Sequence, residues 1–197
     1  MKRLFTLLAL TITVSISAQL TAVTEGGSTG QRLSTSNASN HGDIGSNAVD
    51  LSYSNSSSST RGATGNYSVA SGWQTIASGN YSVASGWQTI ASGNYSTAMG
   101  VSTTASGTES TATGWQTTAS GIGSTAMGEQ TTASGESSTA MGYQSTASGI
   151  GSTAMGKSTA SGTYSSAIGY DAVASGNGST AMGAGTTASA DYSTAMG

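Results

Sequence analysis

The chain has 197 residues with 29 glycines, no proline and no cysteine, and only 7% of its residues are charged. Collagen needs glycine at every third position together with abundant proline, so this composition excludes it. A formal net charge of -3 with regularly spaced apolar residues argues against disorder, and the few lysines and arginines form no cluster that would bind nucleic acid.

The first eighteen residues have the pattern of a secretory signal peptide. Lys2 and Arg3 precede an apolar run that ends at Ile16, and small residues then lead to Ala18. The run is shorter than the roughly 20 apolar residues that cross a bilayer, so a membrane-spanning anchor is the weaker interpretation. We therefore expect a secreted mature chain that starts near Gln19 and has no membrane span. Without cysteine, its stability cannot depend on disulfides.

Residues 19–61 are rich in Ser, Asn and Gly, and most of this segment is expected to be irregular. Within it, Val49, Leu51 and Tyr53 alternate with polar residues, which indicates either a strand that caps the structure that follows or a solvated linker. His41 is the only histidine of the chain and has no cysteine to accompany it. We expect neither a metal site nor a nucleophilic triad.

From residue 62 onward the sequence repeats every seven residues as Ala-x-Gly-x-x-Ser/Thr-x. The register slips by one residue at Lys157 and then resumes. A coiled coil would need apolar a and d positions on good helix formers, and Gly, Ser and Thr are not. A strand of about four residues followed by a turn fits the alternation and the β-branched content. Each seven-residue unit is therefore predicted to be one short strand and one turn.

A second period of fourteen residues overlies the first, because the residue before glycine is Ser in one series of units and mostly Met or Ile in the other. Side chains alternate along a strand, so Ala and the Ser or Thr three residues after Gly are predicted to share a narrow interior between two sheets. The opposite face then carries an apolar column of Met99, Met127, Met141, Met155, Ile168, Met182 and Met196. Since an interior of small residues buries little apolar surface, this column predicts a homo-oligomer whose axis runs along the solenoid.

The units Ser124-Thr-Ala-Met-Gly128, Ser138-Thr-Ala-Met-Gly142, Ser152-Thr-Ala-Met-Gly156 and Ser165-Ser-Ala-Ile-Gly169 are each followed about nine residues later by Ala-Ser-Gly. Over about residues 62–197 they resemble the head repeats of YadA-like trimeric autotransporter adhesins. The resemblance implies an all-β, left-handed parallel β-roll with two short strands per fourteen-residue coil, a homotrimer, and a location at the surface or outer membrane of a Gram-negative bacterium. The family usually has Val and Ile where this chain mostly has Thr and Met, which predicts softer packing. The family's stalk and membrane anchor are not in this sequence, so we interpret the chain as a fragment or as the head of a secreted, tail-fibre-like protein.

Nearly all aromatic residues of the repeat region occupy the two variable positions after glycine, which are expected to lie in surface turns. We expect successive coils to stack them into ladders, with Trp73, Trp87, Trp115 and Tyr143 along one edge and Tyr67, Tyr81 and Tyr95 along the other. Such ladders are either a platform for an extracellular protein or glycan ligand or simply a brace between adjacent turns, and bracing is the favoured interpretation.

The repeat region carries no recognisable catalytic, metal or cofactor site. Its Gly-x-Gly-x-x-Ala matches, such as Gly121 to Ala126, lack the βαβ context of a dinucleotide fingerprint, and Asp171 and Asp191 are too few for a calcium β-roll. We therefore expect a protein that is not an enzyme. An adhesin head that attaches a bacterial cell to host or environmental surfaces is the favoured function. A structural spacer and an ice-binding solenoid with threonine rows such as Thr104, Thr118 and Thr132 are the alternatives.

Overall fold

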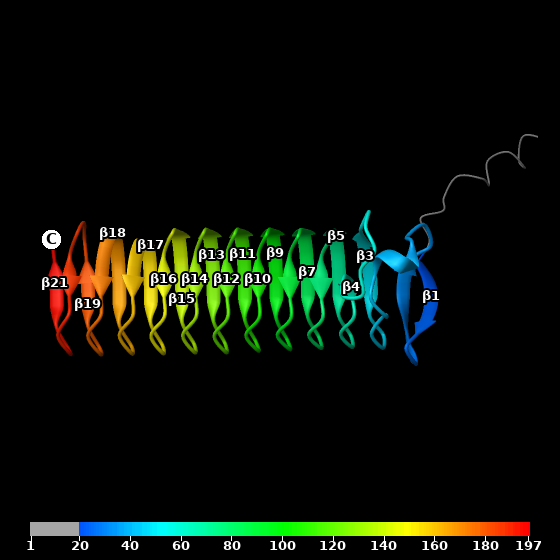
Figure 1. The fold of residues 1–197 in the computed structure, drawn as a ribbon. Coiled ribbons are helices and arrows are strands. Elements are labelled where there is room, and N and C mark those ends of the chain that lie inside the picture. Colours follow the sequence, from blue (N-terminus) through cyan, green and yellow to red (C-terminus); the bar gives the residue numbers. More distant parts are fainter. Residues whose placement is uncertain (1–19) are drawn as a thin grey trace, which may run out of the picture.

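The computed structural model describes residues 20–197 and shows a straight rod of stacked coils (Figure 1). The predicted signal peptide lies outside the described residues. Strands pair in parallel with the equivalent strand of the next coil, fourteen residues on over most of the rod, as when Thr111 pairs with Thr125 and Thr125 with Thr139. The predicted all-β, parallel β-solenoid is confirmed. Residues 20–197 include no helix that is long and apolar enough to cross a membrane.

Each regular coil contains one longer and one shorter strand, so the prediction of two short strands per coil is also confirmed. The longer strands are β5 (Val69–Trp73), β7 (Val83–Trp87), β9 (Thr97–Val101), β11 (Thr111–Trp115), β13 (Thr125–Glu129) and β15 (Thr139–Tyr143). The shorter strands are β4 (Gly62–Ala63), β6 (Ile76–Ala77), β8 (Ile90–Ala91), β10 (Thr104–Ala105), β12 (Thr118–Ala119), β14 (Thr132–Ala133), β16 (Thr146–Ala147) and β20 (Thr187–Ala188). Near the C-terminal end lie β17 (Thr153–Ala160), β18 (Ser166–Ala174), β19 (Thr180–Met182) and β21 (Thr194–Met196).

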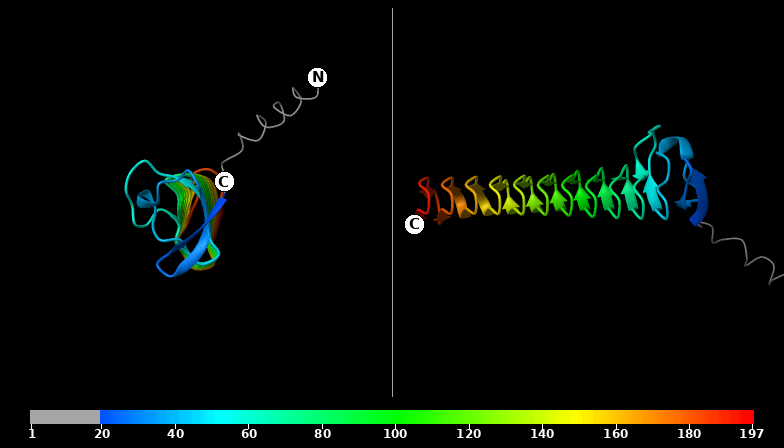
Figure 2. Two further views of the ribbon diagram at one scale, coloured as in Figure 1. Left: turned by 90° about the vertical axis from the view of Figure 1, so that its right-hand side faces the viewer. Right: turned by 90° about the horizontal axis from the view of Figure 1, so that it is seen from below.

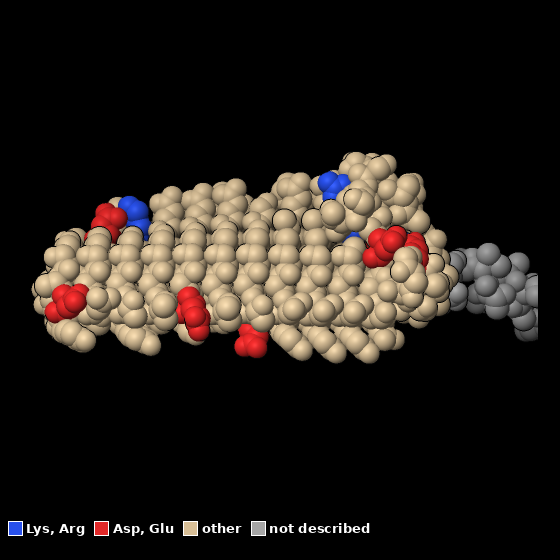
Figure 3. Space-filling view, turned by 60° about the horizontal axis from the view of Figure 1, so that its bottom comes forward, with Lys and Arg blue, Asp and Glu red and all other residues tan. Residues whose placement is uncertain are grey.

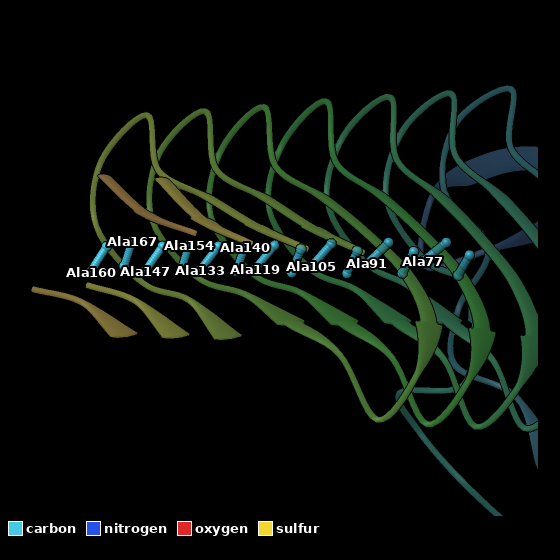
Figure 4. Packing of buried hydrophobic residues seen from close by; sticks show 14 of the residues in the cluster. Ala77, Ala91, Ala105, Ala119, Ala133, Ala140, Ala147, Ala154, Ala160 and Ala167 are labelled. Atoms are coloured by element: carbon cyan, nitrogen blue, oxygen red, sulfur yellow. The ribbon is translucent and has the colours of Figure 1, made fainter. Parts of the chain in front are cut away.

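The interior is filled by small side chains from both kinds of strand. Figure 4 shows alanines of successive coils following one another along the rod, and these alanines are fully buried. The serine or threonine three residues after glycine, such as Ser82 and Thr89, is also buried in the regular coils, as predicted. The hydroxyls of both have no hydrogen-bond partner among the described residues, and an unpaired buried hydroxyl costs free energy. The interior is therefore a weak source of stability, and the ladder of backbone hydrogen bonds holds successive coils together.

Glycine recurs every seven residues because successive coils approach closely at their turns. A Cβ on Gly79 would collide with the carbonyl oxygen of Gly93, one coil further on. In the other series the backbone adds a second requirement, since Gly86 has a φ of +128°, which side-chain-bearing residues rarely adopt. The second turn position is left-handed as well, with a φ of 58° at Tyr81 and 53° at Gln88, a feature that the sequence did not reveal.

The segment before the repeats is more regular than its composition indicates. The strands β1 (Leu20–Glu25) and β2 (Ser28–Leu33) form an antiparallel hairpin, followed by the 3-10 turn η1 (Ala38–Asn40) and the strand β3 (Val49–Tyr53). Strand β3 pairs in parallel with β2 on one side and with β5, the first longer strand of the repeat, on the other. The stack of coils therefore continues into residues 20–61. An end-on view shows the hairpin lying across the end of the coils (Figure 2).

A buried ion-pair cluster holds this N-terminal end together. Arg32 lies 3.2 Å from the carboxylate of Asp50 and 2.8 Å from that of Glu25, and it also donates to the carbonyl oxygen of Gly42. His41 Nδ1 lies 3.0 Å from Asp50 Oδ2, the same carboxylate oxygen that Arg32 contacts. Burial by itself raises the pKa of Asp50, but the hydrogen bonds from His41 and Ser52 outweigh it and hold the pKa below its usual value of 3.8.

The substitution Asp50→Asn is expected to loosen residues 20–61 while leaving the repeat coils folded. It removes a buried carboxylate from the guanidinium of Arg32, a change that costs about 3 kcal/mol when a buried pair is broken. Because the pKa of Asp50 is lowered on folding, its contribution to stability is complete above pH 3.8 and is lost as the pH falls from there through the folded-state pKa.

Hydrogen exchange of the N-terminal backbone amides as a function of pH measures this effect. The exposed Asp43 provides the control, since Asp43→Asn should leave the exchange pattern unchanged. Equal exchange rates in the parent chain and in the Asp50→Asn variant would show that the cluster does not stabilise this end.

Candidate functional site

The outward face of the longer strands carries the predicted apolar column. Met127, Met141, Met155, Ile168, Met182 and Met196 are successive register partners, and Met99 is separated from them by Thr113. Their neighbours in the strand, the alanines, are buried, so the methionines point away from the interior. Towards the N-terminus the column continues as Ser85, Ser71 and Leu51.

A second row lies beside this column on the same face, two residues earlier in each strand. It begins with Val49, Val69 and Val83 and continues mostly as threonine from Thr97, and these four side chains are half-buried. The apolar contribution therefore moves from the valine row in the first coils to the methionine row in the later ones, on one face of one sheet. We call the two rows together the Met face.

One turn edge carries Trp73, Trp87, Trp115 and Tyr143, but they do not form the continuous ladder that the sequence predicts. Trp73 and Trp87 are register partners, whereas the aromatic contact among the described residues of this edge joins Trp73 to Tyr53, with centroids 5.1 Å apart and rings tilted by 42°. Val101 separates Trp87 from Trp115, and Glu129 separates Trp115 from Tyr143. On this edge Trp73 is half-buried against Tyr53, whereas Trp87, Trp115 and Tyr143 are exposed and make no aromatic contact with one another.

Glutamines brace this edge in place of stacked rings. Gln144 donates from Nε2 to Oε1 of Gln130 at 2.9 Å, and Gln130 donates in the same way to Gln116 at 3.2 Å. A second run joins Gln88 to Gln74. These ladders were not predicted from the sequence, although glutamine recurs at fourteen-residue intervals at the second turn position.

The opposite turn edge stacks its tyrosines as the spacing predicts. Tyr67, Tyr81 and Tyr95 have centroid separations of 4.9 and 5.1 Å, and their rings lie within 2° of parallel. The backbone N–H of Asn80 donates to Asn94 Oδ1 at 3.0 Å, which ties neighbouring turns together. The stack both braces three coils and leaves about half of each ring in solvent, so it can serve either role.

The described residues offer little acid–base or metal chemistry. No group of three or more His, Asp or Glu side chains in residues 20–197 could hold a metal ion. Ser52 Oγ and Asp50 Oδ2 both lie at the same nitrogen of His41, so the three do not form a Ser-His-Asp triad. Charged side chains are few and scattered on the face that Figure 3 shows.

Comparison with protein families decides what the repeat is. The model of the YadA head domain repeat matches residues 63–89, 91–117, 119–145, 133–159, 160–186 and 174–197. The chain belongs to the YadA head repeat family. This repeat builds adhesin-type domains of trimeric autotransporters, which are exposed at the surface of Gram-negative bacteria. No curated protein matches the chain.

The YadA head repeat matches place the Met face and both aromatic edges of residues 67–143 within the family domain. Two matches meet between residues 159 and 160, so the repeat continues through the register slip at Lys157. Residues 20–61 precede every match, although β3 pairs with the first longer strand of the repeat. The threonines Thr104, Thr118 and Thr132 do form a row, but they lie half-buried on strands of only two residues. Such a narrow surface does not favour ice binding.

Proposed function

We propose that this chain is the adhesive head of a bacterial surface protein and attaches the cell to host or environmental surfaces. The observation that carries the proposal is the rod of YadA head repeats, whose exposed side chains are displayed coil by coil along two turn edges. A rigid rod of this kind holds many equivalent contact points in fixed register. Weak contacts at each point then add up to firm attachment.

The proposal includes association of three chains through the Met face. Met99 and Met182 are about 40% exposed in the single chain, and the face is flat because the strands are in strict register. The interior consists of alanines and of small hydroxyl side chains, many of them unpaired, and it buries little apolar surface. Covering the Met face would therefore supply hydrophobic stabilisation that the coils themselves lack.

Export to the cell surface is the location that the proposed function requires. The pattern of residues 1–18 supports it, since a basic start, an apolar run and small residues before Gln19 are typical of a secretory signal.

Replacing exposed aromatics along the edges is expected to reduce attachment. In cells or beads that display the chain, Trp87→Ser together with Trp115→Ser should lower the number that stay attached to a coated surface by at least about tenfold, because exposed aromatic side chains provide most of the binding energy at such contacts. A second variant with Tyr67, Tyr81 and Tyr95 changed to serine tests the other edge in the same way.

The control variant carries Ile122→Ser and Ile150→Ser, which removes exposed apolar side chains of another kind from turns of the same rod. If attachment persists in both aromatic variants and only the reach of the head changes when coils are deleted, the chain is a spacer and not the adhesive element.

A further inference from the structure

The coil that begins after Gly156 is one residue shorter than its neighbours. In β17 the chain runs without a turn from Thr153 to Ala160, and its partner β18 absorbs the difference with a bulge. Lys157 pairs with Tyr170 and Ser158 with Ala172, which leaves Asp171 as the extra residue in a left-handed conformation with a φ of 54°. The glutamine position of the turn is missing from this coil.

The missing position leaves a hollow of about 560 Å³ in the turn edge. Tyr143 and Tyr170 belong to the coils on either side of the short coil, so they stand roughly 10 Å apart along the rod, given a strand spacing of about 4.8 Å. Both side chains are exposed, Tyr143 to 47% and Tyr170 to 63%. The other lining residues are Gly142, Gln144, Gly156, Lys157 and Gly169. The three glycines contribute only backbone to the lining, so the side chains of the two tyrosines project beyond the floor of the hollow.

Charged and uncharged polar side chains lie in and beside the hollow. Lys157 Nζ lies 3.0 Å from the carboxylate of Asp171 and 4.7 Å from the centroid of the Tyr170 ring. Gln144 donates to Gln130, but the short coil has no glutamine to donate in turn to Gln144 Oε1. The lining therefore combines the ammonium of Lys157 with an amide at the end of its ladder, and Asp171, which lies beside the hollow, balances the charge of Lys157.

We propose that this hollow binds one residue of a neutral saccharide, with the sugar ring against a tyrosine face and its hydroxyls hydrogen-bonded to Lys157, Asp171 and Gln144. The apolar C–H face of a sugar matches an exposed aromatic ring. Hydroxyls both donate and accept, which suits an ammonium, a carboxylate and an amide carbonyl together. Because Lys157 and Asp171 already neutralise each other, no net charge at the hollow favours a charged ligand over a neutral one.

The volume of the hollow lies within the range of about 300–1,000 Å³ for small-molecule sites. The inference rests on the proposed adhesive function and names a glycan as one of its ligands.

A glycan array probed with the purified chain tests the proposal. We expect binding to a subset of neutral glycans, and we expect Tyr170→Ser and Asp171→Asn each to weaken that binding at least tenfold. A third variant inserts glutamine between Lys157 and Ser158, which restores a fourteen-residue coil and fills the hollow. It should abolish binding. Ile122→Ser removes an exposed side chain from the opposite turn edge, outside the hollow; it is the control and should bind as the parent does.

The molar mass of each variant in solution is also measured. It distinguishes a variant that binds weakly because its chains no longer associate from one that has lost the saccharide site. Absence of any neutral glycan ligand, or binding that survives both the insertion and Tyr170→Ser, would overturn the saccharide site. Attachment of cells by a chain that binds no glycan would leave the adhesive function standing and remove only this inference. Preference for charged glycans, or for a peptide, in the same hollow would equally contradict it.

Discussion

The substitution Gly114→Val will unfold several coils around its position and lower the denaturant midpoint of the rod. Gly114 has a φ of +127°, and a Cβ there would collide with the carbonyl oxygen of Gly128 in the next coil. The backbone fixes the position of Cβ, so no change of rotamer relieves the contact, and the branched side chain of valine adds further atoms beside it. Backbone strain and lost ladder hydrogen bonds together should cost about 4 kcal/mol, at the upper end for single substitutions. Urea unfolding followed by circular dichroism measures the loss.

The matched control is Gly123→Ser in the opposite turn. Gly123 also has a positive φ, of 64°, but the nearest atom to a Cβ there is Ser137 Oγ at 3.7 Å. The equivalent positions of the coils before and after hold Glu109 and Ser137 with almost the same backbone. The free energy of unfolding of this variant should therefore lie within about 1 kcal/mol of the parent value, because substitutions at exposed, unstrained positions have small effects on stability. If both variants unfolded alike, close approach of the coils would not be the reason for the glycine repeat.

The repeat could be predicted from the sequence because each of its features recurs at a fixed interval. Alternation within Thr-Ala-Met placed alanine inside and methionine outside, and the fourteen-residue difference between units gave two unequal strands per coil. Local pattern and tertiary packing agree in such a fold, since every coil meets the same neighbours as the last. The positive φ at Tyr81 escaped prediction because tyrosine rarely adopts it. Glycine at the equivalent positions Gly123, Gly151 and Gly178 is the signal that could have revealed it.

Residues 20–61 could not be predicted in the same way, because long-range contacts hold them together. Arg32, Asp50 and His41 are scattered in the sequence, and only the folded chain brings Arg32 and His41 to about 3 Å from the carboxylate of Asp50. The hollow beside Lys157 is an intermediate case. The one-residue slip is plain in the sequence, but the bulge at Asp171 and the gap between Tyr143 and Tyr170 follow from how β18 accommodates it.

Placing charge in the Met face is expected to separate the proposed trimer into single chains. In the triple variant Met127→Lys, Met141→Lys and Met155→Lys, three ammonium groups occupy successive positions of one column. Burying each of them without a partner would cost several kcal/mol, and the three also repel one another. Light scattering after gel filtration should give three times the single-chain mass for the parent and the single-chain mass for the variant.

The control places the same charges on the other sheet, as Thr118→Lys, Thr132→Lys and Thr146→Lys, which are also successive register partners. It should keep the mass of the parent, because the proposed contact uses one face only. A parent chain that is monomeric at all concentrations would contradict the assembly, and so would a Met-face variant that keeps the parental mass.

Thermal stability gives a second, independent readout. If association covers the Met face, the melting temperature of the parent rises with protein concentration, whereas that of the dissociated variant does not, since only an assembled native state gains stability by mass action.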